Sequence, residues 1–455
     1  MRTETLLFDL EETASASSSE KWLYDEIIAA YEQEELVTPV RYLLDKVTYA
    51  SPVNFRESMQ SPRHRWFPYK EGFSPSFVRS FLSEFAPANS QNILDPFSGV
   101  GTTLLESSRL GYVTHGFEVS PMSFAIAQIK ATSFSQSDLD ELTNWISVFS
   151  LASLVDVALA PDNQTVISYF DESYLNALLS VKAFYLKINS KKVQELFRLT
   201  FLNCLERYST HRKAGNGLKR KTRLSYTATF ESPVEQIRQT IISDLQKFRA
   251  DLLDEPTIEG FNLRYGSCLD ETLYDDDVHF DAVLTSPPYA NCFDYSKIYI
   301  VELWLGDFFT SQQSQKSFRK DSLRSHVHAR WAERHSAFGS DLVNNQIFNY
   351  LSAQKLWSAQ IPGMIKGYFN DMGRLLSILS KRCRPGATVG LVVGNSYYGS
   401  LPIATDLLLP MIGRQFGFEP VRIDVYRNVI VSSQQFTRAR DRKYMRESLV
   451  ILRKI

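Results

Sequence analysis

The run from Ile93 to Thr103 (ILDPFSGVGTT) constrains the fold of this chain more than any other segment. It predicts an apolar strand, a turn that contains Gly99 and Gly101, and a helix that begins near Thr102. This order is typical of the nucleotide-binding turn of doubly wound α/β sheets, in which the first amide groups of the helix point toward a ligand. We therefore expect a sheet with a small-molecule site at the carboxyl ends of its strands.

A second strand, Thr114 to Glu118, is predicted one helix later, and its final carboxylate can accept hydrogen bonds from both hydroxyls of a ribose. The turn lacks the third glycine of the dinucleotide fingerprint, because Leu104 occupies that position, and no Gly-Lys-Ser/Thr follows for an ATP phosphate loop. Asp95 can accept from an ammonium group, which S-adenosylmethionine has and NAD lacks. The pattern favours S-adenosylmethionine over NAD.

A rigid polar rim is predicted where another strand ends, in Thr285-Ser286-Pro287-Pro288-Tyr289. The preceding run, Phe280 to Leu284, has the pattern of a buried strand, so the rim lies at the edge where open α/β sheets bind ligands. A proline pair after an apolar run can also be ordinary punctuation. Together with the turn after Asp95, it indicates an enzyme that methylates an exocyclic amino group.

With these motifs the chain resembles the amino-group DNA methyltransferases, which methylate cytosine N4 or adenine N6. The resemblance spans most of residues 61–455 and adds two segments: Arg65 to Phe73, similar to the segment at the methionine end of the cofactor, and Gly266 to Asp270, similar to the segment beside its adenine. It implies an α/β, doubly wound, Rossmann-like methyltransferase sheet that ends in an antiparallel hairpin, with strands near Glu419 to Tyr426 and Ser448 to Arg453. The cofactor-binding residues that it implies are Tyr69, Lys70, Phe73, Asp95, Phe97, Gly99, Gly101, Thr102, Thr103, Glu118, Val119, Ser267, Cys268, Asp270 and Thr285.

The catalytic residues implied are Ser286, Pro287, Pro288 and Tyr289. The lone pair of a base amino group is delocalised into the ring, so the Ser286 hydroxyl and the Pro287 carbonyl are expected to accept hydrogen bonds from it and draw the nitrogen toward tetrahedral geometry. The prolines keep the backbone preorganised, and Tyr289 is expected to stack on a base turned out of the duplex. Serine is no strong base near neutral pH, so we expect the proton to leave after methyl transfer.

The identity of the base and of the nucleic acid is less constrained. In this family serine at position 286 is associated with cytosine N4 and aspartate with adenine N6, so cytosine N4 is favoured and adenine N6 is the alternative. The cofactor turn precedes the catalytic motif here, whereas many relatives with Ser-Pro-Pro-Tyr have the reverse order. An RNA methyltransferase that acts on guanosine N2 and a non-catalytic cofactor-binding protein are further alternatives, and a glutamine N5 methyltransferase would carry asparagine at position 286.

Two insertions are predicted to interrupt the sheet. The segment between Glu118 and Gly266 is far longer than the usual connection of one helix and short loops, and helical periodicity over Ser190 to Tyr208 and after Ser232 predicts a helical insertion. We divide the chain into an acidic, partly helical N-terminal arm (residues 1–50), a catalytic domain (51–125 and 256–455), a helical insertion that is a candidate for target recognition (126–255), and a second insertion that is a candidate for DNA contact (291–348).

Basic segments in these insertions and in the last hairpin are candidates for phosphate contact. They are a predicted loop from His211 to Arg223, a mixed basic and aromatic stretch from Lys316 to Arg334, and a predicted turn from Thr437 to Lys443. A solvated surface is the alternative for each. The candidate nucleic-acid-binding residues are Arg212, Lys213, Lys219, Arg220, Lys221, Arg223, Arg319, Lys320, Arg438 and Arg440.

Charge and cysteine usage fit a cytoplasmic enzyme whose partner is double-stranded DNA. Residues 1–36 hold ten acidic and two basic residues, so the rest of the chain is net positive although the total is −1.

The four cysteines show no paired spacing, so no disulfide framework is implied. No apolar run reaches the roughly 18 residues that a membrane span needs. No metal site is predicted, because no cysteine or third histidine stands at ligand spacing from His326 and His328. The resemblance leaves open a homodimer and a separately encoded restriction or defence partner.

Overall fold

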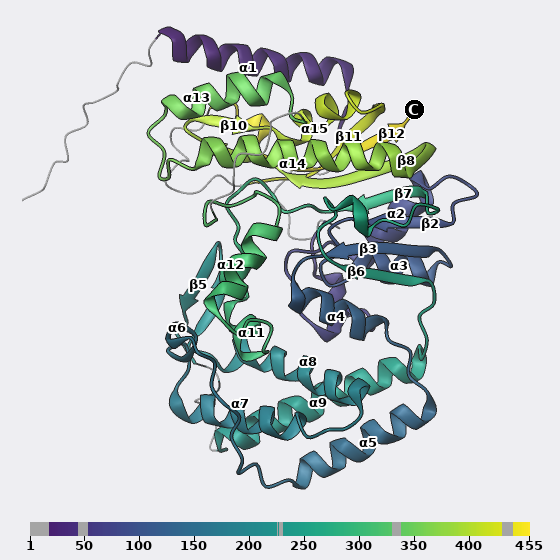
Figure 1. The fold of residues 1–455 in the computed structure, drawn as a ribbon, viewed down its shortest axis with the longest axis vertical. Coiled ribbons are helices and arrows are strands. Elements are labelled where there is room, and N and C mark those ends of the chain that lie inside the picture. Colours follow the sequence, from purple (N-terminus) through teal and green to yellow (C-terminus); the bar gives the residue numbers. More distant parts are fainter. Residues whose placement is uncertain (1–17, 44–52, 225, 227–230, 330–337, 430–439) are drawn as a thin grey trace, which may run out of the picture.

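The computed structural model describes residues 18–43, 53–224, 226, 231–329, 338–429 and 440–455, and it is built on one eight-stranded sheet (Figure 1). The strand order across this sheet is β1-β11-β12-β8-β7-β2-β3-β6. The strands are β1 (Val40–Tyr42), β2 (Asn92–Asp95), β3 (Val113–Glu118), β6 (Phe261–Tyr265), β7 (Phe280–Thr285), β8 (Cys383–Gly394), β11 (Phe418–Asn428) and β12 (Arg446–Lys454).

The sheet is parallel from β8 to β6, and its antiparallel strand is β12. This strand pairs antiparallel with both β8 and β11, whereas β7 pairs parallel with β8 and β2, and β2 pairs parallel with β3. The predicted doubly wound sheet with a C-terminal antiparallel hairpin is therefore confirmed. The chain leaves β2 for β3 on one side and returns to β7 on the other, so the strand order reverses between β2 and β7, where such sheets bind ligands.

Helices cover both faces of the sheet, which explains why β7 is buried at every position. Alternate residues of a strand face opposite sides, so Ala282 and Leu284 pack in one core with Phe81, and Val283 packs in the other core with Leu375 and Leu407. The covering helices are α2 (Pro75–Phe85), α3 (Thr102–Arg109), α4 (Pro121–Ala131), α14 (Ile361–Arg382) and α15 (Thr405–Arg414).

The acidic N-terminal segment contains helix α1 (Ser18–Val37), which lies over α13 (Phe348–Ala353) and α15 at the top of Figure 1. Ile27 and Tyr31 of this helix are buried in the larger sheet core. On its acidic side, Glu34 pairs with Arg414 at 2.7 Å and Glu35 with Arg446 at 2.9 Å. The described part of the arm therefore packs on its own catalytic domain, and strand β1 follows it to the sheet edge.

The helical insertion forms a separate layer at the bottom of Figure 1, and its presence confirms the expectation of inserted helices. Trp66 of the catalytic domain joins the two parts: its ring stacks on Phe248 at 4.8 Å between centroids, and its indole nitrogen donates to Asp251 at 2.8 Å. The elements are α5 (Gln136–Leu151), α6 (Gln164–Ile167), α7 (Glu172–Tyr185), α8 (Lys191–Tyr208), β4 (His211–Ala214), β5 (Gly217–Arg220) and α9 (Pro233–Asp254).

The capping box of α5 is made by Ser135 and Asp138, because Ser135 is the residue with extended backbone before the helix. One local expectation about this insertion was wrong. The basic segment after His211 is an antiparallel β-hairpin, β4 and β5, rather than a loop. Gly215, with φ +58°, occupies its turn, where a left-handed conformation is needed.

The second insertion and the remaining segments complete the structure. The helices after the catalytic motif are α10 (Tyr295–Ile298), α11 (Ile300–Leu305) and α12 (Gln312–Asp321), followed by a π-helical turn (Leu342–Ile347) and α13 (Phe348–Ala353). Strands β9 (Ser396–Tyr398) and β10 (Leu401–Ile403) form a small hairpin, and short 3-10 turns lie at Glu57–Met59, His64–Trp66, Glu271–Leu273 and Arg442–Tyr444. Within the described ranges, no helix has the length and apolar character that crossing a membrane requires.

Candidate active site

A cavity that opens to solvent lies at the reversal point of the sheet. Residues from five predicted segments meet there although they are far apart in the sequence. The predicted residues that line it are Tyr69, Phe73, Asp95, Phe97, Gly99, Thr102, Glu118, Val119, Ser267, Cys268, Ser286 and Pro288. A second opening shares Val119 and Ser267 with this cavity and adds Asp270.

The turn after β2 adopts the conformation that its glycines permit. Gly99 and Gly101 have φ of +51° and +84°, and Gly101 is the residue that precedes α3. A side chain at position 99 would also approach the Tyr69 ring to 3.3 Å. The two carboxylate oxygens of Glu118 accept backbone N–H groups from Gly99 at 2.7 Å and Ser120 at 2.6 Å. Glu118 thus holds the turn in shape as well as facing the cavity.

Asp95 joins the cofactor turn to the catalytic strand. Its Oδ1 atom accepts from the Thr285 hydroxyl at 2.5 Å and from the Phe97 N–H at 3.1 Å. Burial raises the pKa of Asp95 to about 6, against hydrogen bonds from Thr285, Thr103 and Phe97 that lower it. Burial likewise raises the pKa of Glu118 to about 7, although backbone N–H groups lower it. Two buried carboxyl groups at one wall make a site suited to a ligand with a positive charge and hydroxyl donors.

Hydrogen bonds to the neighbouring strands β8 and β12 hold two side chains of the catalytic motif. The Ser286 hydroxyl donates to the carbonyl of Val392 at 3.3 Å, and the Tyr289 hydroxyl donates to Glu447 at 2.7 Å. The Tyr289 ring lies against Gly394, where an added Cβ would come within 2.7 Å of it. Of the motif, Ser286 and Pro288 line the cavity, whereas Thr285, Pro287 and Tyr289 do not.

The segment upstream of α2 supplies a wall that includes one residue missed by the sequence analysis. The Tyr69 ring stacks on Tyr299 with centroids 5.6 Å apart, and the Tyr299 hydroxyl donates to Glu71, which lines the cavity. Lys70 points the other way, with its ammonium 3.8 Å from Glu206. Glu71 could have been found from its place between two predicted cofactor residues, whereas Tyr299 carries no signal in the sequence.

The structure separates the candidate nucleic-acid residues into exposed and internally paired groups. Lys213 is nearly buried in ion pairs with Glu206 and Glu302, Lys221 donates to three carbonyl groups at the end of α8, and Arg319 pairs with Asp294 at 3.1 Å. These three cations are engaged inside the protein. Those that remain exposed are Arg212, Lys219, Arg220, Arg223, Lys320 and Arg440, and Arg438 lies outside the described residues.

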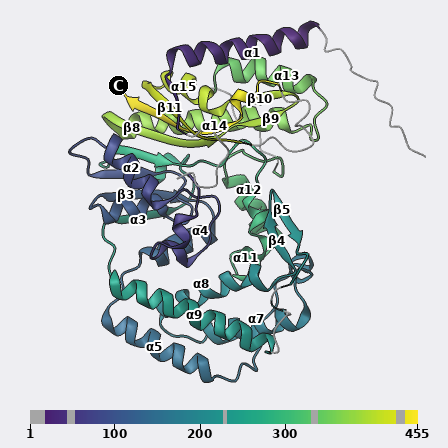
Figure 2. The ribbon, with the colours of Figure 1, turned by 180° about the vertical axis from the view of Figure 1, so that it is seen from behind.

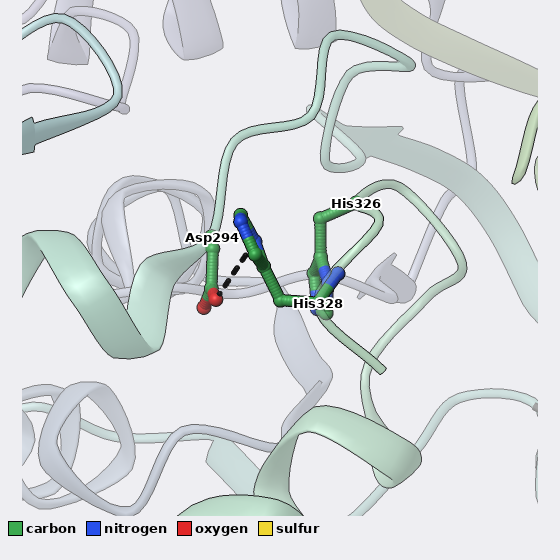
Figure 3. A group of neighbouring side chains, drawn as sticks. All are labelled: Asp294, His326 and His328. Carbon is green, nitrogen blue, oxygen red and sulfur yellow. Dashed lines mark hydrogen bonds and ion pairs between the residues drawn. The ribbon is translucent and has the colours of Figure 1, made fainter. Parts of the chain in front are cut away.

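Asp294, His326 and His328 form a cluster beside the cavity (Figure 3). Their nearest nitrogen and oxygen atoms all lie within 4.8 Å of one another. Asp294 lies far from the two histidines in the sequence, so no ligand spacing points to it, and the fold brings it to them. Asp294 and His326 line the cavity together with Phe318 and Tyr295, all from the second insertion.

Comparisons with known proteins show that the chain is similar in sequence to two Type II methyltransferases. No protein-family model matches the chain. The Type II methyltransferase M.AvaI of Nostoc sp. is 27% identical over 441 residues, which cover 88% of each chain. The Type II methyltransferase M.BsoBI of Geobacillus stearothermophilus is 25% identical over 456 residues, 88% of this chain and 87% of the relative. The rRNA methyltransferase aviRa of Streptomyces viridochromogenes has a TM-score of 0.28 at 10% identity, with 89% and 93% of the two chains covered, a likeness too slight to bear on the fold.

The doubly wound sheet, with its cavity at the reversal point, fits an α/β methyltransferase fold. Over 88% of its length the chain is similar to Type II methyltransferases, which confirms the resemblance to methyltransferases that its motifs carry. A methyltransferase implies an S-adenosylmethionine-type cofactor. The buried carboxyl groups of Asp95 and Glu118 and the turn that contains Gly99 and Gly101 fit such a cofactor.

Proposed function

We propose that this protein is a site-specific DNA methyltransferase that moves a methyl group from S-adenosylmethionine to the exocyclic N4 of cytosine, in a base turned out of the duplex. One observation carries the proposal: the Ser286 rim and the Asp95 and Glu118 carboxyl groups line a single cavity at adjoining strand ends. The relatives that span 88% of the chain are Type II methyltransferases, which supports a role in restriction–modification.

The cofactor residues divide by the group that each would hold. Glu118 would accept from the ribose hydroxyls, Asp95 would face the ammonium group, and Ser267 and Asp270 would flank the adenine. Tyr69 and Phe73 would pack against the methionine part, beside the turn at Gly99. When bound, the cofactor supplies an electrophilic methyl group on a sulfonium centre.

The rim would orient the target nitrogen. The Ser286 hydroxyl donates its hydrogen to the Val392 carbonyl. Its oxygen lone pairs would therefore accept a hydrogen bond from the amino group. The Pro287 carbonyl would accept the second amino hydrogen, so the nitrogen lone pair is turned away from the ring. Tyr289, held by Glu447, would support the base at the edge of the cavity. No proton need be removed before attack, because the nitrogen becomes acidic once it carries the methyl group.

The basic hairpin is proposed to contact the DNA backbone next to the extruded base. Arg212 and Lys219 are directly opposite in the β4–β5 register, so their side chains share one face of the hairpin. The hairpin tip reaches the catalytic loop, since the Asn216 amide donates to the Asn291 carbonyl at 3.4 Å. The exposed pair Arg212 and Lys219 therefore lies on an element whose tip contacts the chain two residues beyond Tyr289. Figure 2 shows this hairpin, β4 and β5, beside α11 and α12.

Mass spectrometry of nucleosides tests the proposal. The purified protein is incubated with labelled S-adenosylmethionine and, in parallel, with duplex DNA, RNA and protein. We expect label in DNA alone, and digestion should yield N4-methylcytosine. N6-methyladenine without N4-methylcytosine would contradict the assignment of the base, label in RNA alone would contradict the DNA substrate, and no transfer to any acceptor would support a non-catalytic protein.

A further inference from the structure

A third carboxyl group lines the cavity and has no part in the mechanism above. Glu71 lies with Asp95 and Glu118 among the lining residues. Within the described part of the chain, none of these three carboxyl groups forms an ion pair. A carboxylate removed from water without a nearby cation is costly. Three such groups at one cavity therefore suit a positively charged ligand, and Glu71 is the one without an assigned role.

The carboxyl group of Glu71 is held by the wall behind it. The Tyr299 hydroxyl donates to Oε2 of Glu71, and the Tyr299 ring stacks on Tyr69 with centroids 5.6 Å apart. Burial raises the pKa of Glu71, whereas the hydrogen bond from Tyr299, the charge of Lys213 and the N–H of Glu71 itself lower it. A carboxylate has about four acceptor positions, so these hydrogen bonds leave Glu71 able to accept from a ligand.

The two lysines near Glu71 are directed at other carboxylates. The Lys213 ammonium pairs with Glu206 at 3.1 Å and with Glu302. The Lys70 ammonium lies 3.8 Å from the same Glu206. Neither lysine therefore neutralises Glu71 by direct contact, and the side of Glu71 that faces the cavity is left to a ligand cation.

The residues next to Glu71 touch the cofactor turn. A Cβ added at Gly99 would lie 3.3 Å from the Tyr69 ring, and one added at Gly72 would lie 3.9 Å from the Thr102 hydroxyl. This segment therefore flanks the start of α3, where backbone N–H groups attract a carboxylate. An amino acid carries its ammonium group on the same carbon as its carboxylate. A ligand carboxylate at the start of α3 would thus bring its ammonium group to the segment that carries Glu71.

Asp95 by itself offers few acceptors for such a group. An ammonium group has three N–H donors. Oδ1 of Asp95 already accepts from the Thr285 hydroxyl at 2.5 Å and from the Phe97 N–H at 3.1 Å. A second carboxylate is therefore needed to satisfy the ammonium group in a cavity that excludes much of the water.

We propose that Glu71 is a cofactor-recognition residue, whose carboxylate accepts a hydrogen bond from the α-ammonium group of the methionine part and shares this cation with Asp95. The inference rests on the proposed function, in which S-adenosylmethionine occupies the cavity. Opposite charges attract strongly at this range in a partly dry site. Loss of the Glu71 charge should therefore weaken ligands that carry the amino group and leave ligands without it little changed.

A change of one ligand group tests this contact by binding alone. Calorimetry compares S-adenosylhomocysteine with its analogue that lacks the α-amino group, for the wild-type protein and for Glu71→Gln. The ratio of the two dissociation constants is the amino-group penalty. We expect this penalty to be about tenfold or more greater for the wild-type protein, because a hydrogen bond between charged groups is lost only there. Glu259→Gln, the same change at an exposed position before β6, should keep the wild-type penalty.

Two further arms show whether the effect is specific. An analogue that keeps the amino group and lacks the α-carboxylate should have the same penalty in the wild-type protein and in Glu71→Gln. Tyr299→Phe keeps the ring that stacks on Tyr69 and removes the hydroxyl that holds Glu71, so it should lower the amino-group penalty in part. This variant also provides the test if Glu71→Gln does not fold.

The outcomes separate this inference from the proposed function. A full wild-type amino-group penalty in Glu71→Gln and Tyr299→Phe would overturn the role of Glu71 while leaving the proposed function intact. Equal falls in the amino-group and carboxylate penalties would also overturn it, because they would show a general loosening of the site. A wild-type protein that binds neither S-adenosylmethionine nor S-adenosylhomocysteine would instead remove the proposed function.

Discussion

At the residue scale, Ser286 is the side chain on which the proposed chemistry depends most directly. Ser286→Ala should lower kcat by about 10–100-fold, because one acceptor for the amino group is lost where charge develops. Cofactor affinity should change little, since the carboxyl groups of Asp95 and Glu118 remain. Rapid-quench methylation and calorimetric titration of the cofactor measure the two effects. Ser147→Ala, on the exposed side of α5, is the matched control, and full turnover in Ser286→Ala would exclude Ser286 from the mechanism.

The raised carboxyl pKa values predict how the ligand-free protein responds to pH. Since Asp95 and Glu118 have folded pKa values of about 6 and about 7, above their usual values of 3.8 and 4.5, the folded protein binds more protons than the unfolded chain between about pH 4 and 7. Their contribution to the free energy of unfolding is present below this window and is lost as pH rises through it. Glu118→Gln should flatten this dependence in chemical denaturation, and an unchanged pH profile would contradict the raised pKa.

The same protonation should act on the cofactor in the opposite sense. A protonated Glu118 loses an acceptor for ribose hydroxyls, and a protonated Asp95 loses its charge toward an ammonium group, so cofactor affinity should fall as pH drops from about 8 to 5. Calorimetry in buffers of different ionisation enthalpy should show net proton release on binding near pH 6. Binding without proton release, at constant affinity, would contradict the assignment of these two carboxyl groups.

At the element scale, the β4–β5 hairpin is expected to contribute phosphate contacts through one face. The Arg212→Ala/Lys219→Ala double variant should weaken DNA binding and reduce the slope of log affinity against log salt concentration by about 2, near one for each lost contact. Fluorescence anisotropy at several salt concentrations measures the slope. Lys187→Ala/Lys247→Ala makes the same charge change on exposed positions of α7's end and α9, and an equal loss there would show a non-specific charge effect.

The hairpin also illustrates what charge patterning leaves undecided. Arg212 and Lys213 are adjacent in a basic run, and both were expected to contact phosphate. Neighbouring residues of a strand face opposite sides, so Lys213 turns inward to Glu206 and Glu302 while Arg212 stays exposed. The hairpin register, rather than the composition of the run, selects the cations that remain exposed.

At the scale of the whole molecule, helix α1 is part of the catalytic core rather than a detachable tail. Ile27 is fully buried in the core that also contains α14 and α15. Ile27→Ala should lower the free energy of unfolding by about 2–5 kcal/mol, as for other buried large-to-small changes. Leu36→Ala, where the side chain is 80% exposed on the same helix, should change it by about 0.5 kcal/mol or less. Equal midpoints for the two variants in urea denaturation would contradict the packing of α1.

The elements that were predicted well are those with a continuous local pattern. The buried run before Ser286 is strand β7, and the periodic segment from Ser190 to Tyr208 is helix α8, each within one residue of its expected bounds. Helix α14 begins at Ile361 although Gly363 and Gly367 weaken the helical signal of its first turns, because burial against the sheet overrides local propensity. Propensity sets element type, and packing sets the ends.

The sequence by itself determined the class of enzyme, because the cofactor turn and the catalytic rim are contiguous runs attached to predicted strands. Only the tertiary structure decided what surrounds them. Glu447, 158 residues from Tyr289, holds its hydroxyl, and Asp294 and His326 close the cavity from an insertion in which no motif was recognised. Contacts of this kind arise from the pairing of distant strands and the packing of inserted helices, and local periodicity carries no information about either.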